Sequence, residues 1–124
     1  MGYEEFIDQV RRQAELGSSS ETETAVRATL TTLGEYLDED GEPDLTSRLP
    51  EELAEHLRRE PSGRIVSYSL DAFVEEVGKR EGVNTDEASA HARAVMDVLR
   101  EAIGQDGVED LRRRLPSELA PLFD

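Results

Sequence analysis

Apolar residues recur along this chain at helical spacing. Over residues 3–15 they stand zero, three, four, seven and eleven positions along, as Tyr3, Phe6, Ile7, Val10 and Ala14. A second line over residues 21–37 runs through Val26, Leu30, Leu33 and Leu37, at steps of three or four. Both patterns place the apolar side chains on one side of a helix. The chain is therefore predicted to be all-α.

The same plan returns in the second half. Residues 44–54 contain a Leu-Pro step at Leu49-Pro50, and the stretch recurs over 110–120 with Leu115-Pro116, at a constant offset of 66. The second apolar line also recurs at this offset, as Ala92, Met96, Leu99 and Ile103. We therefore predict a compact bundle of about eight helices built from two pseudo-repeats. It forms a single domain over 1–124, with repeat one at 1–60, a connector at 61–67 and repeat two at 68–124.

Local signals predict where the helices begin and turn. Ser18 with Glu21, or Ser20 with Glu23, makes a capping box, and Asn84 with Glu87 supplies a cap in the second half. Residues 38–43 and 104–107 are predicted turns, because glycine and proline interrupt helices there. Each Leu-Pro step is predicted to be a corner between two short helices that directs Leu49 and Leu115 into the core.

The two copies of the second helix differ in polarity. Thr29, Thr32 and Tyr36 in the first copy correspond to Val95, Val98 and Ala102 in the second. One interpretation is that the second copy lies at the centre of the bundle, because helices apolar on several sides are usually buried. The other is that Val95, Val98 and Ala102 form an exposed strip that contacts a protein partner or a second copy of the chain.

Charge narrows the classes of partner. The chain has 29 acidic and 14 basic residues, a net charge of −15, and Lys79 is its one lysine. Such a surface repels nucleic acid and anionic membranes. Two interpretations stay open: an acidic protein of an ordinary cytoplasm, or a halophilic protein adapted to high salt, where ions screen the self-repulsion.

Other features favour a cytoplasmic protein. The chain has no cysteine, which excludes disulfides and thiolate metal sites. No apolar run approaches the roughly 20 residues of a membrane span. The first residues, Met-Gly-Tyr-Glu-Glu, do not resemble a signal peptide.

Candidate chemistry is sparse. His56 and His91 have no metal-ligand spacing and are predicted at the surface or its boundary, with a pH switch as the residual interpretation. In the acidic turn before Gly41, a calcium loop would need an acid where Tyr36 stands. Arg112 and Arg113 are weak candidates for a phosphate or partner contact. No catalytic, cofactor-binding or metal-binding residue is predicted.

The doubled pattern resembles a known family. The residues that carry the resemblance are Phe6 and Phe73, Leu45 and Leu111, Leu49-Pro50 and Leu115-Pro116, and Glu52-Leu53 and Glu118-Leu119. Together they resemble the domain-of-unknown-function family 2267 of bacteria and archaea, over nearly the whole chain. The resemblance implies an all-helical tandem repeat and brings no established activity or site residues. Here the first inter-helix turn is one residue longer, at Ser18–Ser20.

Two hypotheses for function follow. The first is a binding or scaffold module that self-associates or docks a protein partner. The alternative is a ligand-binding or catalytic protein with a pocket between the two repeats. Polar groups converging in a cleft between the repeats would favour the alternative, and a solid apolar seam would oppose it.

Overall fold

Helices make up the regular structure of the computed structural model, which describes residues 1–37, 48–57 and 67–123. They are α1 (Tyr3–Ala14), α2 (Ser19–Tyr36), α3 (Glu51–Leu57), α4 (Leu70–Glu81), α5 (Thr85–Arg114) and the 3-10 helix η2 (Ser117–Phe123). These ranges contain no strand, so the all-α prediction is confirmed. The described ranges hold six such elements, and the predicted count of about eight is not confirmed.

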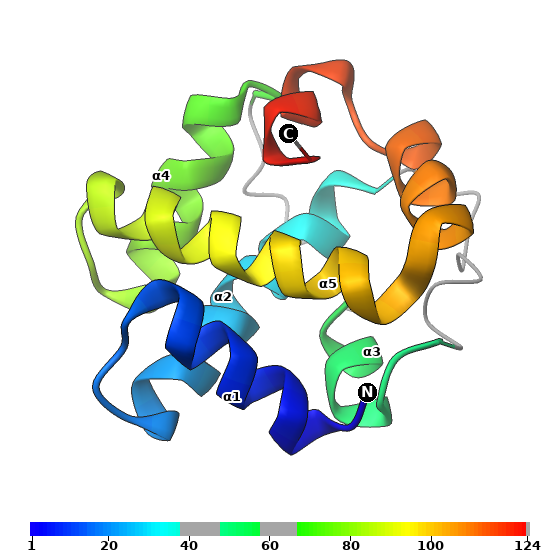
Figure 1. Ribbon diagram of the computed structural model, residues 1–124. Coiled ribbons are helices and arrows are strands. Elements are labelled where there is room, and N and C mark those ends of the chain that lie inside the picture. The colour runs from blue at the N-terminus through cyan, green and yellow to red at the C-terminus, as the bar shows by residue number, and fades with distance from the viewer. Residues whose placement is uncertain (38–47, 58–66, 124) are drawn as a thin grey trace.

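Helix α5 holds the central position. Its first part crosses the middle of the molecule in Figure 1, and α5 packs against α1, α2, α4 and η2. Helix α3 packs on α2. One hydrophobic cluster draws side chains from all six elements, including Phe6 of α1, Phe73 of α4 and Leu53 of α3. The amphipathic stripes therefore meet in one shared core.

Side-chain caps set the starts of the two long helices. The Ser18 hydroxyl accepts a hydrogen bond from the backbone N–H of Glu21 at 3.1 Å. The Asn84 carbonyl oxygen accepts one from the backbone N–H of Glu87 at 2.8 Å. Each cap satisfies a backbone donor that has no partner inside the helix. The predicted Asn84 cap is confirmed, and Ser18 rather than Ser20 caps α2. The return contact of the Glu21 carboxylate in the predicted capping box stays a prediction.

The predicted turn over 104–107 is a break of one residue. Gly104 has φ 76° and ψ 175°, a conformation that residues other than glycine rarely adopt. The chain returns to helix immediately afterwards and continues to Arg114. Arg48 donates a hydrogen bond to the carbonyl oxygen of Ile103 at 2.7 Å, which satisfies the carbonyl just before the break.

Both Leu-Pro corners direct their leucines inward. Leu49 and Leu115 are buried in the core cluster. The carbonyl oxygens of Pro50 and Pro116 each accept a backbone hydrogen bond at 3.0 Å from the residue three positions on. The second corner leads into the 3-10 helix η2, which contains Pro121.

The first residues of several elements agree with the predicted offset of 66. Helices α2 and α5 begin at the predicted offset from each other, and so do α3 and η2. Helices α1 and α4 have 12 residues each, and their starts lie one position further apart because the first inter-helix turn is longer. Superposition of the two halves stays a prediction. Leu45, the acidic turn over 38–43 and most of the connector, residues 61–66, lie outside the described residues.

The structure decides between the two interpretations of the second long helix. Val95 and Val98 are fully buried and Ala102 is half-buried, so α5 is the central helix and no exposed strip forms there. A partner cannot reach Val95 or Val98 in this fold. None of the helices in the described part is long and apolar enough to cross a membrane.

Candidate functional site

A hollow of about 470 Å³ lies between the α1–α2 turn and the α4–α5 turn. We call it the inter-turn hollow. Four carboxylates line it: Glu15 and Glu21 come from the first turn, and Glu81 and Glu87 come from the second. His91 of α5 lines it as well. Polar groups from both halves of the chain therefore converge on one partly open cavity.

The α4–α5 turn positions the central pair of this site. The backbone N–H groups of Gly82 and Val83 both donate to the carbonyl oxygen of Gly78, at 2.8 and 3.0 Å. Gly82 has φ 80°, the left-handed conformation that commonly ends a helix. This tight reversal brings Glu81, the last residue of α4, beside His91, where the Glu81 carboxylate forms a short hydrogen bond with Nδ1 of the ring.

Glu81 and His91 are largely removed from solvent. The Glu81 side chain is 5% exposed and the His91 side chain 10%. Burial raises the pKa of Glu81, and the charge of Glu87 adds to this, while the hydrogen bond and charge of His91 lower it by less. The second carboxylate oxygen, Oε1, is buried and has no hydrogen-bond partner among the described residues. Such an atom costs free energy until a donor reaches it.

The hollow does not contain a recognisable nucleophile. Ser20 and Thr24 line it, and the Thr24 hydroxyl donates to the backbone carbonyl of Ser20 at 3.1 Å. No hydrogen bond in the described part of the chain joins either hydroxyl to His91. Activation of a nucleophile by a base requires that contact. Neither the Ser20 nor the Thr24 hydroxyl is therefore paired with a base among the described residues.

The four carboxylates do not converge on one point. Within residues 1–37, 48–57 and 67–123, no three His, Cys, Asp or Glu side chains come together closely enough to hold a metal ion. A metal ion needs several ligands at about 2.0–2.6 Å from one centre. The four carboxylates therefore line the hollow without forming a metal site in the described part of the chain.

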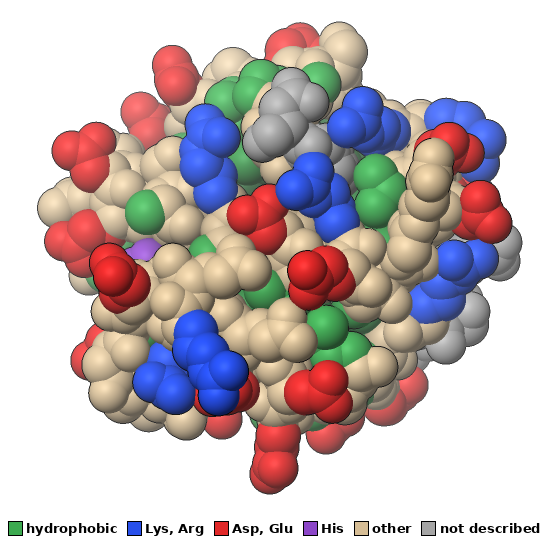
Figure 2. Space-filling model, in the orientation of Figure 1, with side chains coloured by type: hydrophobic (Ala, Val, Ile, Leu, Met, Phe, Trp, Pro, Cys, Tyr) green, Lys and Arg blue, Asp and Glu red, His purple; other side chains and the backbone are tan. Residues whose placement is uncertain are grey.

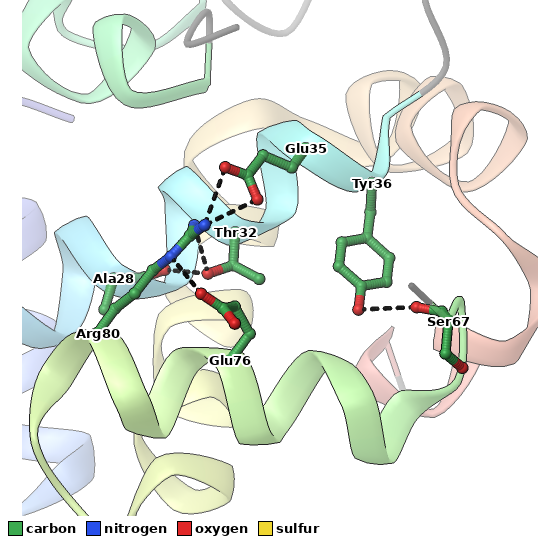
Figure 3. Close-up of polar contacts among 7 residues, drawn as sticks. All are labelled: Ala28, Thr32, Glu35, Tyr36, Ser67, Glu76 and Arg80. Carbon is green, nitrogen blue, oxygen red and sulfur yellow. Dashed lines mark hydrogen bonds and ion pairs between the residues drawn. The ribbon is translucent and has the colours of Figure 1, made fainter. Parts of the chain in front are cut away.

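A second polar cluster joins α2 to α4 (Figure 3). Arg80 donates to both carboxylate oxygens of Glu35, at 2.9 and 2.8 Å, and to the hydroxyl of Thr32 at 3.1 Å. Its Nε lies 2.9 Å from Oε2 of Glu76, an ion pair without the alignment of a hydrogen bond. The side chains of Arg80, Glu35 and Glu76 are 14%, 3% and 10% exposed. Because protein groups occupy the guanidinium, this cluster is a structural link between two helices.

Arg112 and Arg113 lie on the exposed last turn of α5. Arg113 pairs with Asp110 at 3.2 Å, and Arg114 contacts the same carboxylate at 3.3 Å. Burial alone would raise the pKa of Asp110, but the hydrogen bonds and charges of the two arginines outweigh it and hold that pKa below its ordinary value. A phosphate or partner contact at Arg112 and Arg113 stays a prediction. Neither residue lines the inter-turn hollow.

Acidic and basic side chains are interspersed on the surface, as they are along the sequence. In Figure 2, Asp and Glu side chains are distributed over most of the face in view, with Arg and Lys side chains between them. The inter-turn hollow therefore lies in a molecule whose overall field attracts cations.

The burial of His91 was not predicted from the sequence. Its predicted place at the surface or its boundary is wrong, because the structure buries it against Glu81. His56 is half-buried, which agrees with a boundary position. The sequence contained a signal for this burial. His91 stands three positions after Ala88 and four before Val95, and therefore on the apolar side of the helix. A histidine on such a line needs a partner when it is buried.

Comparisons with known proteins identify the family. No curated protein matches the chain. A family model described as "Uncharacterized conserved protein (DUF2267)" matches residues 3–122, nearly the whole sequence. The resemblance seen in the doubled Leu-Pro pattern is thus confirmed, and the chain belongs to the DUF2267 family of uncharacterized conserved proteins.

Proposed function

We propose that this protein binds a small organic amine, as its ammonium cation, in the inter-turn hollow. The observation that carries the proposal is the buried Glu81 carboxylate, whose Oε1 lacks a hydrogen-bond partner among the described residues. An ammonium group donates three hydrogen bonds and carries the opposite charge. Because Oε1 itself is buried, the Glu81 side chain has to turn toward the hollow for the ammonium group to reach it. The contact would then satisfy Oε1 and offset the cost of keeping the carboxylate out of water.

Charge supports a cation over an anion. Glu15, Glu21, Glu81 and Glu87 all line the hollow, and the chain as a whole carries −15. Three of these carboxylates are exposed and partly screened by solvent, but all four carry the same sign and disfavour an anion in the hollow. The volume of about 470 Å³ lies in the range of small-molecule sites. Leu16 and Val83 in the wall suit the alkyl part of an amine.

The proposal develops the hypothesis of a pocket between the two predicted pseudo-repeats. Six lining residues lie between Ala14 and Thr24 in the first, and four lie between Glu81 and His91 in the second. The competing hypothesis of a self-associating scaffold has less support. Met1 and Tyr68 are the large hydrophobic side chains exposed in the described part of the chain, and two residues do not form a contiguous apolar face.

Calorimetric titration of the full chain with n-butylammonium chloride at pH 7 tests the proposal. We expect saturable binding at one site, with affinity at least about tenfold weaker in Glu81→Gln because the charge is lost while the shape is kept. Glu23→Gln is the matched control: Glu23 is an exposed carboxylate of α2 that does not line the hollow. Its affinity should equal that of the wild type.

Nuclear magnetic resonance of the His91 ring supplies a second readout. Bound amine should shift the ring proton signals of His91, because the ring lies beside the carboxylate that the amine contacts. Absence of saturable heat with the wild type, or equal affinity in Glu81→Gln and the wild type, would overturn the proposal. Circular dichroism of each variant checks that the fold is retained.

A further inference from the structure

We infer that binding of an amine in the inter-turn hollow is coupled to the release of one proton from Nε2 of His91. This inference rests on the proposed function of the hollow and adds the regulation of that same site by pH. The observation behind it is a buried pair of side chains with one open atom. Glu81 and His91 hydrogen-bond each other through Oε2 and Nδ1, and both residues line the hollow.

This hydrogen bond determines which ring nitrogen can gain or lose a proton. One proton lies between Oε2 of Glu81 and Nδ1 of His91, because one of the two atoms has to donate. Nε2 makes no hydrogen bond with the described residues, and it is not one of the buried polar atoms that lack a partner. It therefore has surface open to solvent, whereas Oε1 of Glu81 is buried. A second proton on the pair resides on Nε2 and can exchange with water.

The net charge of the pair makes the second proton and the amine alternatives. With the shared proton alone the pair carries one negative charge, and with a second proton it is neutral overall. Burial disfavours a net charge, because the two side chains are only 5% and 10% exposed. Either the second proton or an ammonium group neutralises the pair. Both together would leave an excess positive charge in a poorly solvated place, so the two cations exclude each other.

The surrounding charges favour a cation of either kind. The other charged groups that line the hollow are Glu15 at the end of α1, Glu21 of α2 and Glu87 of α5. Helix η2 packs on α4 and α5 but contributes no lining residue, and within the described ranges no arginine or lysine lines the hollow. Arg80 of α4 is engaged in the α2–α4 cluster. Burial raises the pKa of Glu81, which also favours the form of the pair with more protons.

Titration of the full chain with n-butylammonium chloride between about pH 5 and pH 8 tests the inference. The ligand stays charged over this range, because alkyl ammonium groups lose their proton only near the lysine value of about 10.4. We expect the affinity of the wild type to rise with pH, by at most about tenfold per pH unit, and then to level off. Titrations in two buffers of different ionisation heat count the released protons, which should fall from about one per bound amine to none as the affinity levels off.

His91→Gln separates the ring from the carboxylate. Glutamine keeps an amide that can donate to Glu81 but has no group that titrates. This variant should bind the amine with an affinity that no longer rises between about pH 6 and pH 8. His56→Gln is the matched control and should keep the pH dependence of the wild type, because His56 lies on α3 and does not line the hollow. Nitrogen magnetic resonance of the wild type at about pH 6 should show the Nε2 signal change from protonated to unprotonated when the amine is added.

The outcomes separate this inference from the function it rests on. Saturable binding with the same affinity across the pH range, and with no proton released, would overturn the coupling and leave the amine site standing. A pH dependence that His91→Gln retains would assign the proton to Glu81 and would also overturn the inference. An Nε2 signal that the amine leaves unchanged at about pH 6 would overturn it too. Absence of saturable heat at every pH would overturn the proposed function itself.

Discussion

Replacement of Arg80 by methionine removes the cation that two nearly buried carboxylates share. Glu35 accepts two hydrogen bonds from the guanidinium, and Glu76 lies in an ion pair with it. Methionine keeps much of the apolar stem, so the change isolates the charge and its hydrogen bonds. After the replacement, two like charges from α2 and α4 stand in a site that water hardly reaches.

The expected loss follows from this geometry. Removing one member of a buried ion pair costs about 3–5 kcal/mol, because an uncompensated charge stays behind. The lost contact with Thr32 adds about 1 kcal/mol at most, and the two costs overlap because they belong to one network. We therefore expect Arg80→Met to lower the free energy of unfolding by about 3–5 kcal/mol. That is a large part of the roughly 5–15 kcal/mol that stabilises a typical domain.

Urea unfolding followed by circular dichroism at pH 7 measures this loss. Arg12→Met is the matched control, because Arg12 pairs with Asp8 at 2.9 Å on α1 but the two side chains are 72% and 41% exposed. Exposed pairs contribute about 0–1 kcal/mol and are screened by salt, whereas buried pairs are screened much less. A loss below about 1 kcal/mol for Arg80→Met, or a loss that vanishes in molar salt, would refute the reasoning.

Four further predictions concern packing, pH, the site and salt. Gly34→Ala places a Cβ 2.7 Å from the carbonyl oxygen of Leu57, so α3 must shift. We expect the free energy of unfolding, measured with urea, to fall by about 1–3 kcal/mol. Gly17→Ala is the control, because the atom nearest to its added Cβ lies at 4.0 Å. Burial raises the pKa of Glu81 in the folded state, so the protonated carboxyl favours folding. This contribution to stability is lost as the pH rises through the raised pKa. The wild type should therefore lose more stability than Glu81→Gln between about pH 4 and pH 7. The double variant Glu81→Ala/His91→Ala should be at least as stable as His91→Ala in urea at pH 7, and additive losses would contradict this. Self-repulsion at −15 predicts a melting temperature that rises between about 0.1 and 2 M potassium chloride, and a constant value by circular dichroism would contradict it.

Local signals were enough to predict the helices. Residues 3–15 and 21–37 were expected to be helical from apolar spacing, and the structure has helices at 3–14 and 19–36. Ser18 or Ser20, and Asn84, were expected as caps, and Ser18 and Asn84 are the residues that cap. These signals act within one or two turns, so no knowledge of the tertiary structure is needed to use them. The inward position of Leu49 and Leu115 was predictable for the same reason.

Contacts between distant residues were not predictable in this way. Arg80 meets Glu35 across 45 positions, and the chain offers 29 acidic residues as candidate partners. Glu81 and His91 meet across a tight reversal that has no periodic pattern. The composition therefore allows many possible ion pairs. The packing of α2, α4 and α5 determines which of these pairs form. The sequence predicted only that a pocket could lie between the two predicted repeats. It did not predict which residues line the inter-turn hollow.

The origin of the candidate site lies in a difference between the two halves. When α1 and α4 are aligned by their last residues, Glu81 corresponds to Ala14, and at the predicted offset of 66 His91 corresponds to Ala25. Two small apolar residues therefore stand where the second half has a polar pair. Ala25 is fully buried, and its position needs no charge to be packed. A buried Glu–His pair is weak evidence for a role in stability, because replacing both members together often costs little while removing one leaves a charge uncompensated. If the double alanine variant keeps the fold and loses the amine, the second half acquired its polar pair for binding; if it keeps the amine as well, the pair is packing alone.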